Sequence, residues 1–152
     1  MIPKQIETAS LSHLANLFKG LEPASLQQRQ GFYRASFIGP WWLRITAMPS
    51  LALTGLPNWQ GKKFIDENSA VNILQTRNGL IEKLQMQCQQ QASLVDEKIA
   101  VALSYGEKSP LPWRWVVDEL RVLDENTLLC MTTVNLPLLR HISIPFLLSR
   151  DL

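Results

Sequence analysis

The sequence contains few of the residues from which catalytic and metal sites are usually built. Its 152 residues include only two histidines, His13 and His141, and two cysteines, Cys88 and Cys130. No G-x-S-x-G segment is present, which argues against a histidine-dependent hydrolase. The histidines and cysteines are also scattered without the spacing of metal ligands. The sequence therefore indicates no catalytic residue and no metal site, and it leaves any cofactor unknown.

Charge of one sign is not concentrated anywhere in the chain. Charged residues make up 18% of the sequence, the formal net charge is +2, and no basic run is longer than Lys62-Lys63. Proteins that bind nucleic acid usually carry a clustered basic face, so we expect no nucleic-acid partner. No apolar window has the length of a membrane span, and residues 1–7 do not resemble a signal peptide. We therefore expect a cytoplasmic protein without a membrane span.

Hydrophobic residues are abundant, at 46% of the sequence, which is enough for a chain of this length to bury a core without disulfides or a metal. We predict a single domain over residues 1–152, with an N-terminal helical segment over residues 1–26. Leucine, alanine and phenylalanine recur at helical spacing within Ser10–Leu21, which predicts a short helix. Ser10 is its expected N-cap, and Gly20 is expected at its end.

After residue 29 most of the chain has the pattern of β-strands joined by turns. Asn78-Gly79 is the strongest hairpin signal, because these residues tolerate the positive φ angles of a tight turn. Strands are expected at residues 29–38, 61–66, 70–76, 80–91, 98–105, 115–123, 127–134 and 141–150. Such a series predicts an antiparallel meander that curls into a barrel or a strongly bent sheet over residues 29–151.

Residues 41–56 interrupt the strand pattern with an apolar run that does not alternate. Pro49 is expected to prevent a single uninterrupted helix, so we predict one or two short helical turns. An apolar insert between strands often covers an opening, which makes this segment a candidate lid. The alternative is that Trp41 and Trp42 simply fill the core.

Asp118 is the most unusual single residue, because it places a carboxylate on an otherwise apolar strand face. A buried carboxylate must find a partner. Candidate partners are Arg34, Arg114 and Lys63. One hypothesis is that Asp118 and Arg34 form polar anchors inside a ligand cavity. The other is a buried ion pair or hydrogen-bond network that fixes the strand register.

Several aromatic residues lie near predicted strand ends, where they would line the mouth of a barrel. Ordinary core and rim packing is the alternative for this aromatic set, which comprises Tyr33, Trp59, Tyr105, Trp113 and Trp115. Met86 and Phe146 lie on predicted inward faces. The candidate ligand-binding residues are Tyr33, Arg34, Trp59, Met86, Tyr105, Trp115, Asp118 and Phe146.

Six segments, in order along nearly all of the chain after the first helix, carry a resemblance to a known family. They are residues 31–35, 59–64, 71–72, 102–106, 116–131 and 146–151, and the most specific part is the spacing of Asp118, Arg121, Asp124 and Thr127, followed by Leu128. Together they resemble a bacterial family of uncharacterised proteins named for a G-x-W-x-G motif, with the small domain that usually follows it. Tyr33 and Ala35 replace the tryptophan and the second glycine of that motif. The resemblance implies a lipocalin-like barrel, similar to small barrels that carry apolar ligands, and assigns no reaction.

We therefore predict an antiparallel lipocalin-like or calycin-like β-barrel or half-barrel with an N-terminal helix. The expected function is non-enzymatic binding of a small hydrophobic or amphipathic ligand, because a small barrel commonly encloses one ligand. One alternative is an enzyme that uses Asp118 as acid or base. Another is a filled barrel that docks a partner, or a second copy as a homodimer, through Leu136–Leu139.

Overall fold

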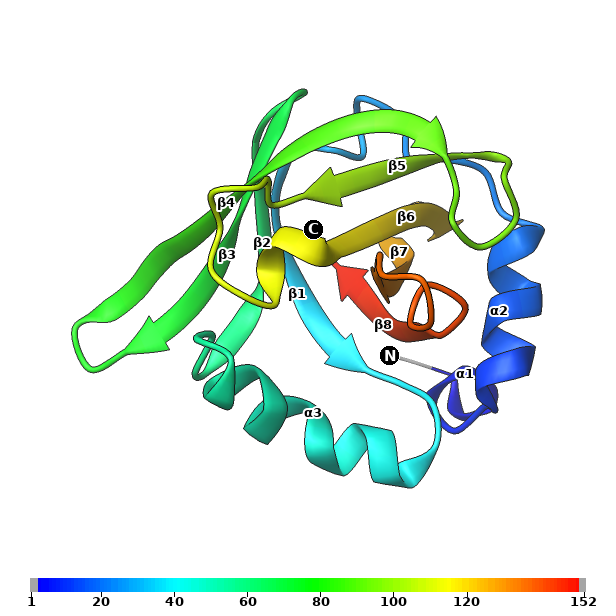
Figure 1. Cartoon of the computed structure of the whole chain (residues 1–152), viewed down its shortest axis with the longest axis horizontal. Helices are drawn as coiled ribbons and strands as arrows, with labels where there is room; N and C mark the ends of the chain where they lie inside the picture. The colour runs from blue at the N-terminus through cyan, green and yellow to red at the C-terminus, as the bar shows by residue number, and fades with distance from the viewer. Residues whose placement is uncertain (1–2, 151–152) are drawn as a thin grey trace.

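Eight antiparallel strands form a closed barrel in a computed structural model that describes residues 3–150 (Figure 1). The strands are β1 (Gly31–Phe37), β2 (Trp59–Asp66), β3 (Ser69–Thr76), β4 (Gly79–Ala92), β5 (Ile99–Ser104), β6 (Val116–Asp124), β7 (Thr127–Val134) and β8 (Ser143–Ser149). The helices are α1 (Lys4–Glu7), α2 (Leu11–Lys19), α3 (Trp41–Leu53) and a short 3-10 helix, η1 (Trp113–Trp115). Expectations that concern Met1 and Asp151 lie outside the described residues.

Each strand pairs with the next one along the chain, and β8 returns to pair with β1. The predicted antiparallel β-barrel is therefore confirmed, and it is closed instead of a half-barrel. All eight predicted strands are present, with ends that differ by a few residues. In the hairpin between β3 and β4, the positive φ angle of 112° falls on Gly79, after the two turn residues Arg77 and Asn78.

Alternate residues of each strand fill the interior of the barrel, as the period of a β-strand requires. Val101 and Leu103 of β5, Leu120 of β6, and Leu128 and Cys130 of β7 belong to one buried apolar cluster. The residues between them face outward. This alternation gives the barrel an inner core and leaves a second set of side chains for the outer surface.

Helix α2 covers part of that outer surface, against β7 and β8. Its buried residues Leu14 and Phe18 share an apolar cluster with Leu129 of β7 and Leu147 of β8. Ser10 caps the helix, because its Oγ accepts a hydrogen bond from the backbone N–H of the third helical residue at 3.1 Å. The predicted N-terminal helix is therefore confirmed, and strands β7 and β8 have apolar packing on both faces.

Arg121 ties this outer layer to the barrel, although it is only 1% exposed. Its guanidinium donates two hydrogen bonds to the carboxylate of Asp96, at 2.7 and 2.9 Å, and one to the carbonyl of Phe18 at 3.1 Å. It also lies 4.4 Å from the centre of the Phe18 ring. Planar, two-pronged pairing of this kind is the strongest geometry available to a buried arginine. One side chain thus joins β6, α2 and the turn before β5.

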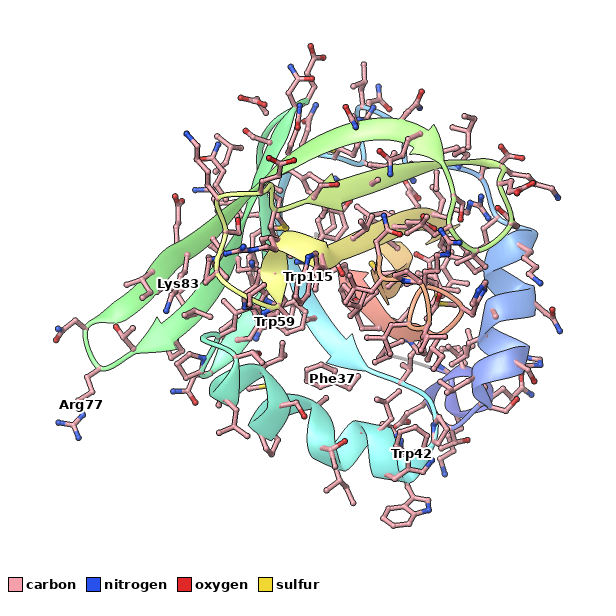
Figure 2. All side chains as sticks on the ribbon, viewed as in Figure 1. Phe37, Trp42, Trp59, Arg77, Lys83 and Trp115 are labelled. Carbon is pink, nitrogen blue, oxygen red and sulfur yellow. The ribbon has the colours of Figure 1, made fainter. Side chains whose placement is uncertain are left out.

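Residues 41–53 form one helix, α3, so the prediction that Pro49 would break this segment is wrong. A proline inside a helix leaves the carbonyl four residues earlier, here Ile45, without its usual donor. Both Ile45 and Pro49 are exposed, so water can satisfy that carbonyl. Trp41 and Trp42 are exposed as well, and Trp42 points away from the barrel (Figure 2), so neither fills the core.

The Asp96–Arg121 pair predicts a pH-dependent contribution to stability. The hydrogen bonds from Arg121 hold the pKa of Asp96 below its ordinary value. A lowered folded-state pKa gives stability that is complete above the unfolded pKa of about 3.9 and is lost as the pH falls through the folded pKa. The substitution Asp96→Asn should therefore lower the free energy of unfolding at pH 7 by about 1–3 kcal/mol. The deficit should shrink as the pH approaches 2, measured by urea denaturation.

Asp124→Asn is a matched control for this experiment. Like Asp96, Asp124 accepts a backbone N–H two residues further on, at 2.9 Å, but it is exposed. We expect its effect at pH 7 to stay within about 0.5 kcal/mol. Equal effects of the two substitutions, or an Asp96→Asn deficit that does not change with pH, would contradict the assigned role of Arg121.

Candidate functional site

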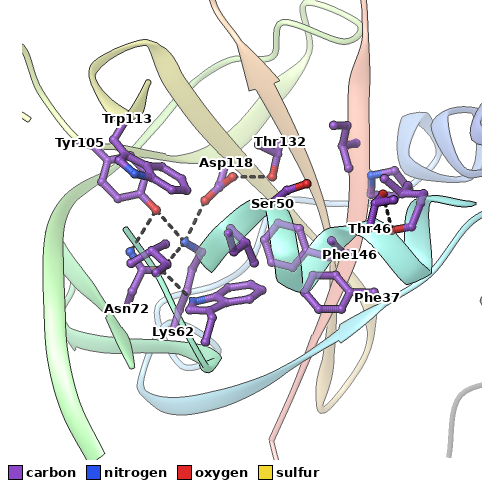
Figure 3. A pocket seen from close by; sticks show the side chains of 17 residues that line it. Phe37, Thr46, Ser50, Lys62, Asn72, Tyr105, Trp113, Asp118, Thr132 and Phe146 are labelled. Atoms are coloured by element: carbon purple, nitrogen blue, oxygen red, sulfur yellow. Dashed lines mark hydrogen bonds and ion pairs between the residues drawn. The ribbon is translucent and has the colours of Figure 1, made fainter. Parts of the chain in front are cut away.

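A cavity of about 190 Å³ lies between α3 and one end of the barrel (Figure 3). Helix α3 contributes residues spaced three and four positions apart, which places them on one face of the helix: Leu43, Thr46, Ala47, Ser50 and Leu51. The cavity is partly open, and two of the residues that line it, Thr46 and Ser50, are exposed. The predicted role of residues 41–56 as a cover over an opening therefore agrees with the position of α3.

The upper walls of the cavity are aromatic and aliphatic. Trp59 packs edge-on against Phe146, with ring centres 5.5 Å apart, and lies 5.8 Å from the ring of Phe37. Trp113 and Ile144 complete these walls. Aromatic walls offer a large contact area to a flat apolar molecule at a small cost in conformational entropy.

A buried ion pair forms the base of the cavity. The Nζ of Lys62 lies 2.8 Å from the Oδ2 of Asp118, and the two side chains are only 2% and 4% exposed. The same Nζ donates to the Oδ1 of Asn72 at 2.9 Å and to the hydroxyl of Tyr105 at 3.1 Å, and it lies 3.3 Å from the sulfur of Met86. The ammonium group is thus surrounded by hydrogen-bond acceptors.

A second ring of hydrogen bonds holds the partners of Lys62 in place. The Oδ1 of Asn72 also accepts from the indole N–H of Trp59 at 3.0 Å, and its Nδ2 donates to the Tyr105 hydroxyl at 3.0 Å. Thr132 donates to the Oδ1 of Asp118 at 2.6 Å. Strands β2, β3, β6 and β7 and the residue after β5 all contribute to this network (Figure 3). Buried hydrogen-bond networks of this kind fix one arrangement of the surrounding elements.

A β-bulge in β2 allows Trp59 and Lys62 to point into the barrel together. The register against β3 shifts between Trp59 and Gly61, so the alternation of faces reverses at this point. Gly61 has a φ of 152°, and a Cβ on it would lie 2.0 Å from the carbonyl oxygen of Tyr33. Only glycine therefore fits at the bulge. The close approach of β1 and β2 therefore depends on Gly61, the residue next to Lys62.

The charges at the bottom of the cavity favour a protonated Lys62 beside a neutral Tyr105. Burial alone would lower the pKa of Lys62, but the negative charge of Asp118 outweighs it, and the pKa of Lys62 is raised. Burial raises the pKa of Tyr105, although the positive charge of Lys62 opposes this. At neutral pH Lys62 is therefore protonated and cannot act as an amine nucleophile, while Tyr105 keeps its hydroxyl hydrogen.

Four of the eight candidate residues line the cavity: Trp59, Tyr105, Asp118 and Phe146. Met86 lies beneath them, in contact with Lys62. Tyr33 is buried elsewhere in the barrel, packed edge-on against Phe64. Trp115 is 37% exposed on η1 and does not line the cavity.

The predicted pairing of Asp118 with Arg34 is wrong, because Arg34 is exposed on the outer face of β1. The other two candidates are also engaged elsewhere. Lys63 pairs with Glu82 at 3.3 Å, and Arg114 donates to a backbone carbonyl. The hypothesis that Asp118 is part of a buried ion pair and hydrogen-bond network is confirmed, with Lys62 as its partner.

Sequence reasoning missed Lys62, Asn72 and Thr132. Strict alternation from Trp59 would put Gly61 and Lys63 on the inner face, and the bulge reverses this. Asn72 could have been found by the signal that identified Asp118, since it is a polar side chain on the apolar face of its strand. Thr132 carried no such signal, because threonine is common on either face of a strand.

Three other predictions concern a membrane span, a metal site and a docking segment. No helix within residues 3–150 is long and apolar enough to cross a membrane. In the same part of the chain, no three histidine, cysteine, aspartate or glutamate side chains are grouped as metal ligands. Leu138 and Leu139 are exposed between β7 and β8. Association through Leu136–Leu139 stays a prediction.

The similarity to known proteins lies in the fold. No family model and no curated protein matches the sequence. The structure is similar to the crystal structure of a protein from Thermomonospora curvata, with a TM-score of 0.69 and 18% sequence identity over 95% of this chain and 90% of that chain. At this identity the similarity shows a shared architecture alone. The class shown here is therefore a closed, mainly antiparallel β-barrel.

The two adjacent lysines allow a direct test of the buried pair. The substitution Lys62→Met removes the charge that compensates Asp118 and should lower the free energy of unfolding by about 3–5 kcal/mol. Lys63→Met removes a half-exposed pair with Glu82 and should change it by less than about 1 kcal/mol. Chemical denaturation at pH 7 measures both. A small effect of Lys62→Met, similar to that of Lys63→Met, would rule out a buried pair.

Proposed function

We propose that the protein binds a small apolar molecule in the cavity beneath α3. The observation that supports this most directly is the cavity itself, about 190 Å³ in volume, with apolar walls above a buried polar base. An engineered apolar cavity of about 150 Å³ in another protein holds benzene. By that comparison the space suits one ring with a short substituent. It is too small for a long acyl chain or a tetrapyrrole.

The way in which α3 is attached supports a binding role. Its N-terminal end is held to α1, because the backbone N–H of Gly39, just before the helix, donates to the carbonyl of Glu7 at 2.9 Å. Its C-terminal end is held by the indole N–H of Trp113, which donates to the carbonyl of Thr54 at 2.6 Å. Between these points the helix faces the cavity instead of a packed core. A cover fixed at both ends leaves space beneath it for a ligand.

The residues at the bottom of the cavity support ligand binding better than they support catalysis by Asp118. The ammonium of Lys62 and the hydroxyl of Thr132 both engage this carboxylate, so acting as an acid or base would require the pair to separate. We also propose that the chain is a divergent member of the G-x-W-x-G family, as its motifs suggest. Its two buried cysteines are free thiols, which supports a cytoplasmic location.

The binding function predicts that filling the cavity weakens binding. Toluene and indole should bind the wild-type protein with dissociation constants on the order of 0.1–1 mM, given the affinity expected per ligand atom. Ala47 faces the cavity, so Ala47→Phe should weaken binding at least about tenfold by occupying the space. Chemical shifts of the cavity residues in NMR titrations report the affinity.

Ala52→Phe is the matched control, because Ala52 is exposed on α3 and does not line the cavity. It should bind the two probes as the wild-type protein does. Ser50→Leu provides a second filling variant, which keeps the test decisive if Ala47→Phe proves unstable. Wild-type protein that binds neither probe, or filling variants that bind as tightly as Ala52→Phe, would refute the proposed function.

A further inference from the structure

The hydrogen bonds of Lys62 are used up within the protein. An ammonium group has three N–H donors. Here three oxygens lie within 3.1 Å of the Nζ, on Asp118, Asn72 and Tyr105. No donor of Lys62 is left for a ligand. This matters because a lysine at the base of an apolar cavity would otherwise suggest a carboxylate ligand.

The cavity also has no net charge. Among residues 3–150, Lys62 and Asp118 are the charged residues that line it, and their charges oppose one another at 2.8 Å. An anionic ligand would lose its hydration without gaining an unpaired cation, and burying an unpaired charge is strongly unfavourable. A cationic ligand meets the same obstacle, because Asp118 is already paired. The cavity therefore selects for neutral molecules.

Tyr105 presents an unused donor at the cavity base. Its hydroxyl oxygen accepts from both Lys62 and Asn72, and within residues 3–150 no acceptor is assigned to its own hydrogen. A buried hydroxyl hydrogen without an acceptor costs free energy, which a ligand oxygen would recover. Burial raises the pKa of Tyr105 by more than Lys62 and Asn72 lower it, so this hydrogen is present at neutral pH.

Asp118 and Thr132 supply the complementary acceptors. Each Asp118 oxygen makes one of these contacts, with Lys62 or Thr132, and can accept a further hydrogen bond. Thr132 acts only as a donor, so its oxygen can also still accept. Asp118 and Tyr105 lie 2.8 and 3.1 Å from the Nζ of Lys62. At the tetrahedral angle of an ammonium group their oxygens are about 4.8 Å apart, a span that one bridging hydroxyl can cover. A hydroxyl group both accepts and donates, and so it matches this base.

We propose, building on the binding function above, that the ligand is a neutral single-ring molecule with one hydroxyl group. The hydroxyl accepts from Tyr105 and donates to Asp118, and the ring lies among Phe37, Trp59 and Phe146. A ring of this size with a hydroxyl and a methyl group has about eight non-hydrogen atoms, which suits a cavity slightly larger than one that holds benzene. A phenol or a benzylic alcohol has the required shape.

Three probes of similar size test this proposal by isothermal titration calorimetry at pH 7. They are 4-methylphenol, which has the hydroxyl; toluene, which lacks it; and benzoate, which carries a charge. We expect 4-methylphenol to bind about three- to tenfold more tightly than toluene, the gain of one or two net hydrogen bonds. Benzoate should bind at least about tenfold more weakly than 4-methylphenol, because its charge stays uncompensated.

The substitution Tyr105→Phe removes the donor and keeps the ring. It should bring the dissociation constants for 4-methylphenol and toluene to within about twofold of each other, and because both are measured on the same variant, this ratio does not depend on an unchanged cavity. Tyr33→Phe is the matched control, since Tyr33 is also buried but donates to the carbonyl of Gln28 outside the cavity. It should preserve the preference for 4-methylphenol. If Tyr105→Phe does not fold, the order of the three affinities in the wild-type protein still tests the hydroxyl proposal.

The outcomes separate this inference from the function on which it rests. Toluene binding as tightly as 4-methylphenol would overturn the hydroxyl proposal and leave the binding function intact. Benzoate as the tightest ligand would overturn the requirement for a neutral molecule, again with the binding function intact. Failure of all three probes to bind would overturn both.

Discussion

The ion pair between Lys62 and Asp118 is the interaction on which the rest of this structure depends. Removing two charges from water costs several kcal/mol each, and their attraction offsets this only when the remaining hydrogen-bonding positions are also satisfied. Here Asn72, Tyr105 and Thr132 satisfy them. These five residues come from β2, β3, β6, β7 and the end of β5, so the pair stays buried only in the register seen in this barrel. The same network forms the floor of the cavity.

The sequence predicts the barrel well because most of its strands obey a simple alternation. Leu84, Met86 and Cys88 face inward together as expected, and Asp118 was identified correctly as an inward carboxylate. The partner of Asp118 could not be predicted in the same way. The bulge at Gly61 reverses the alternation in β2, and it depends on the close approach of β1, a contact between distant parts of the chain.

Helix α3 shows a second limit of sequence reasoning. Pro49 normally ends a helix, but here the carbonyl that it leaves unbonded belongs to a residue on the exposed side, where water replaces the lost donor. Whether a proline is tolerated therefore depends on which face is buried, which is a property of the fold. The intact helix gives the cavity one continuous wall and two points of attachment. Size, neutrality and an unused phenol hydrogen together define the ligand that this space would accept.

A crystal structure of the protein with 4-methylphenol would test this account most directly. We expect the ring to lie among Phe37, Trp59 and Phe146, with its oxygen within hydrogen-bond distance of the Tyr105 hydroxyl and of Asp118. The Lys62–Asp118 pair should remain in place. An empty cavity at saturating 4-methylphenol, or a ring bound with its hydroxyl directed toward solvent along α3, would contradict the account.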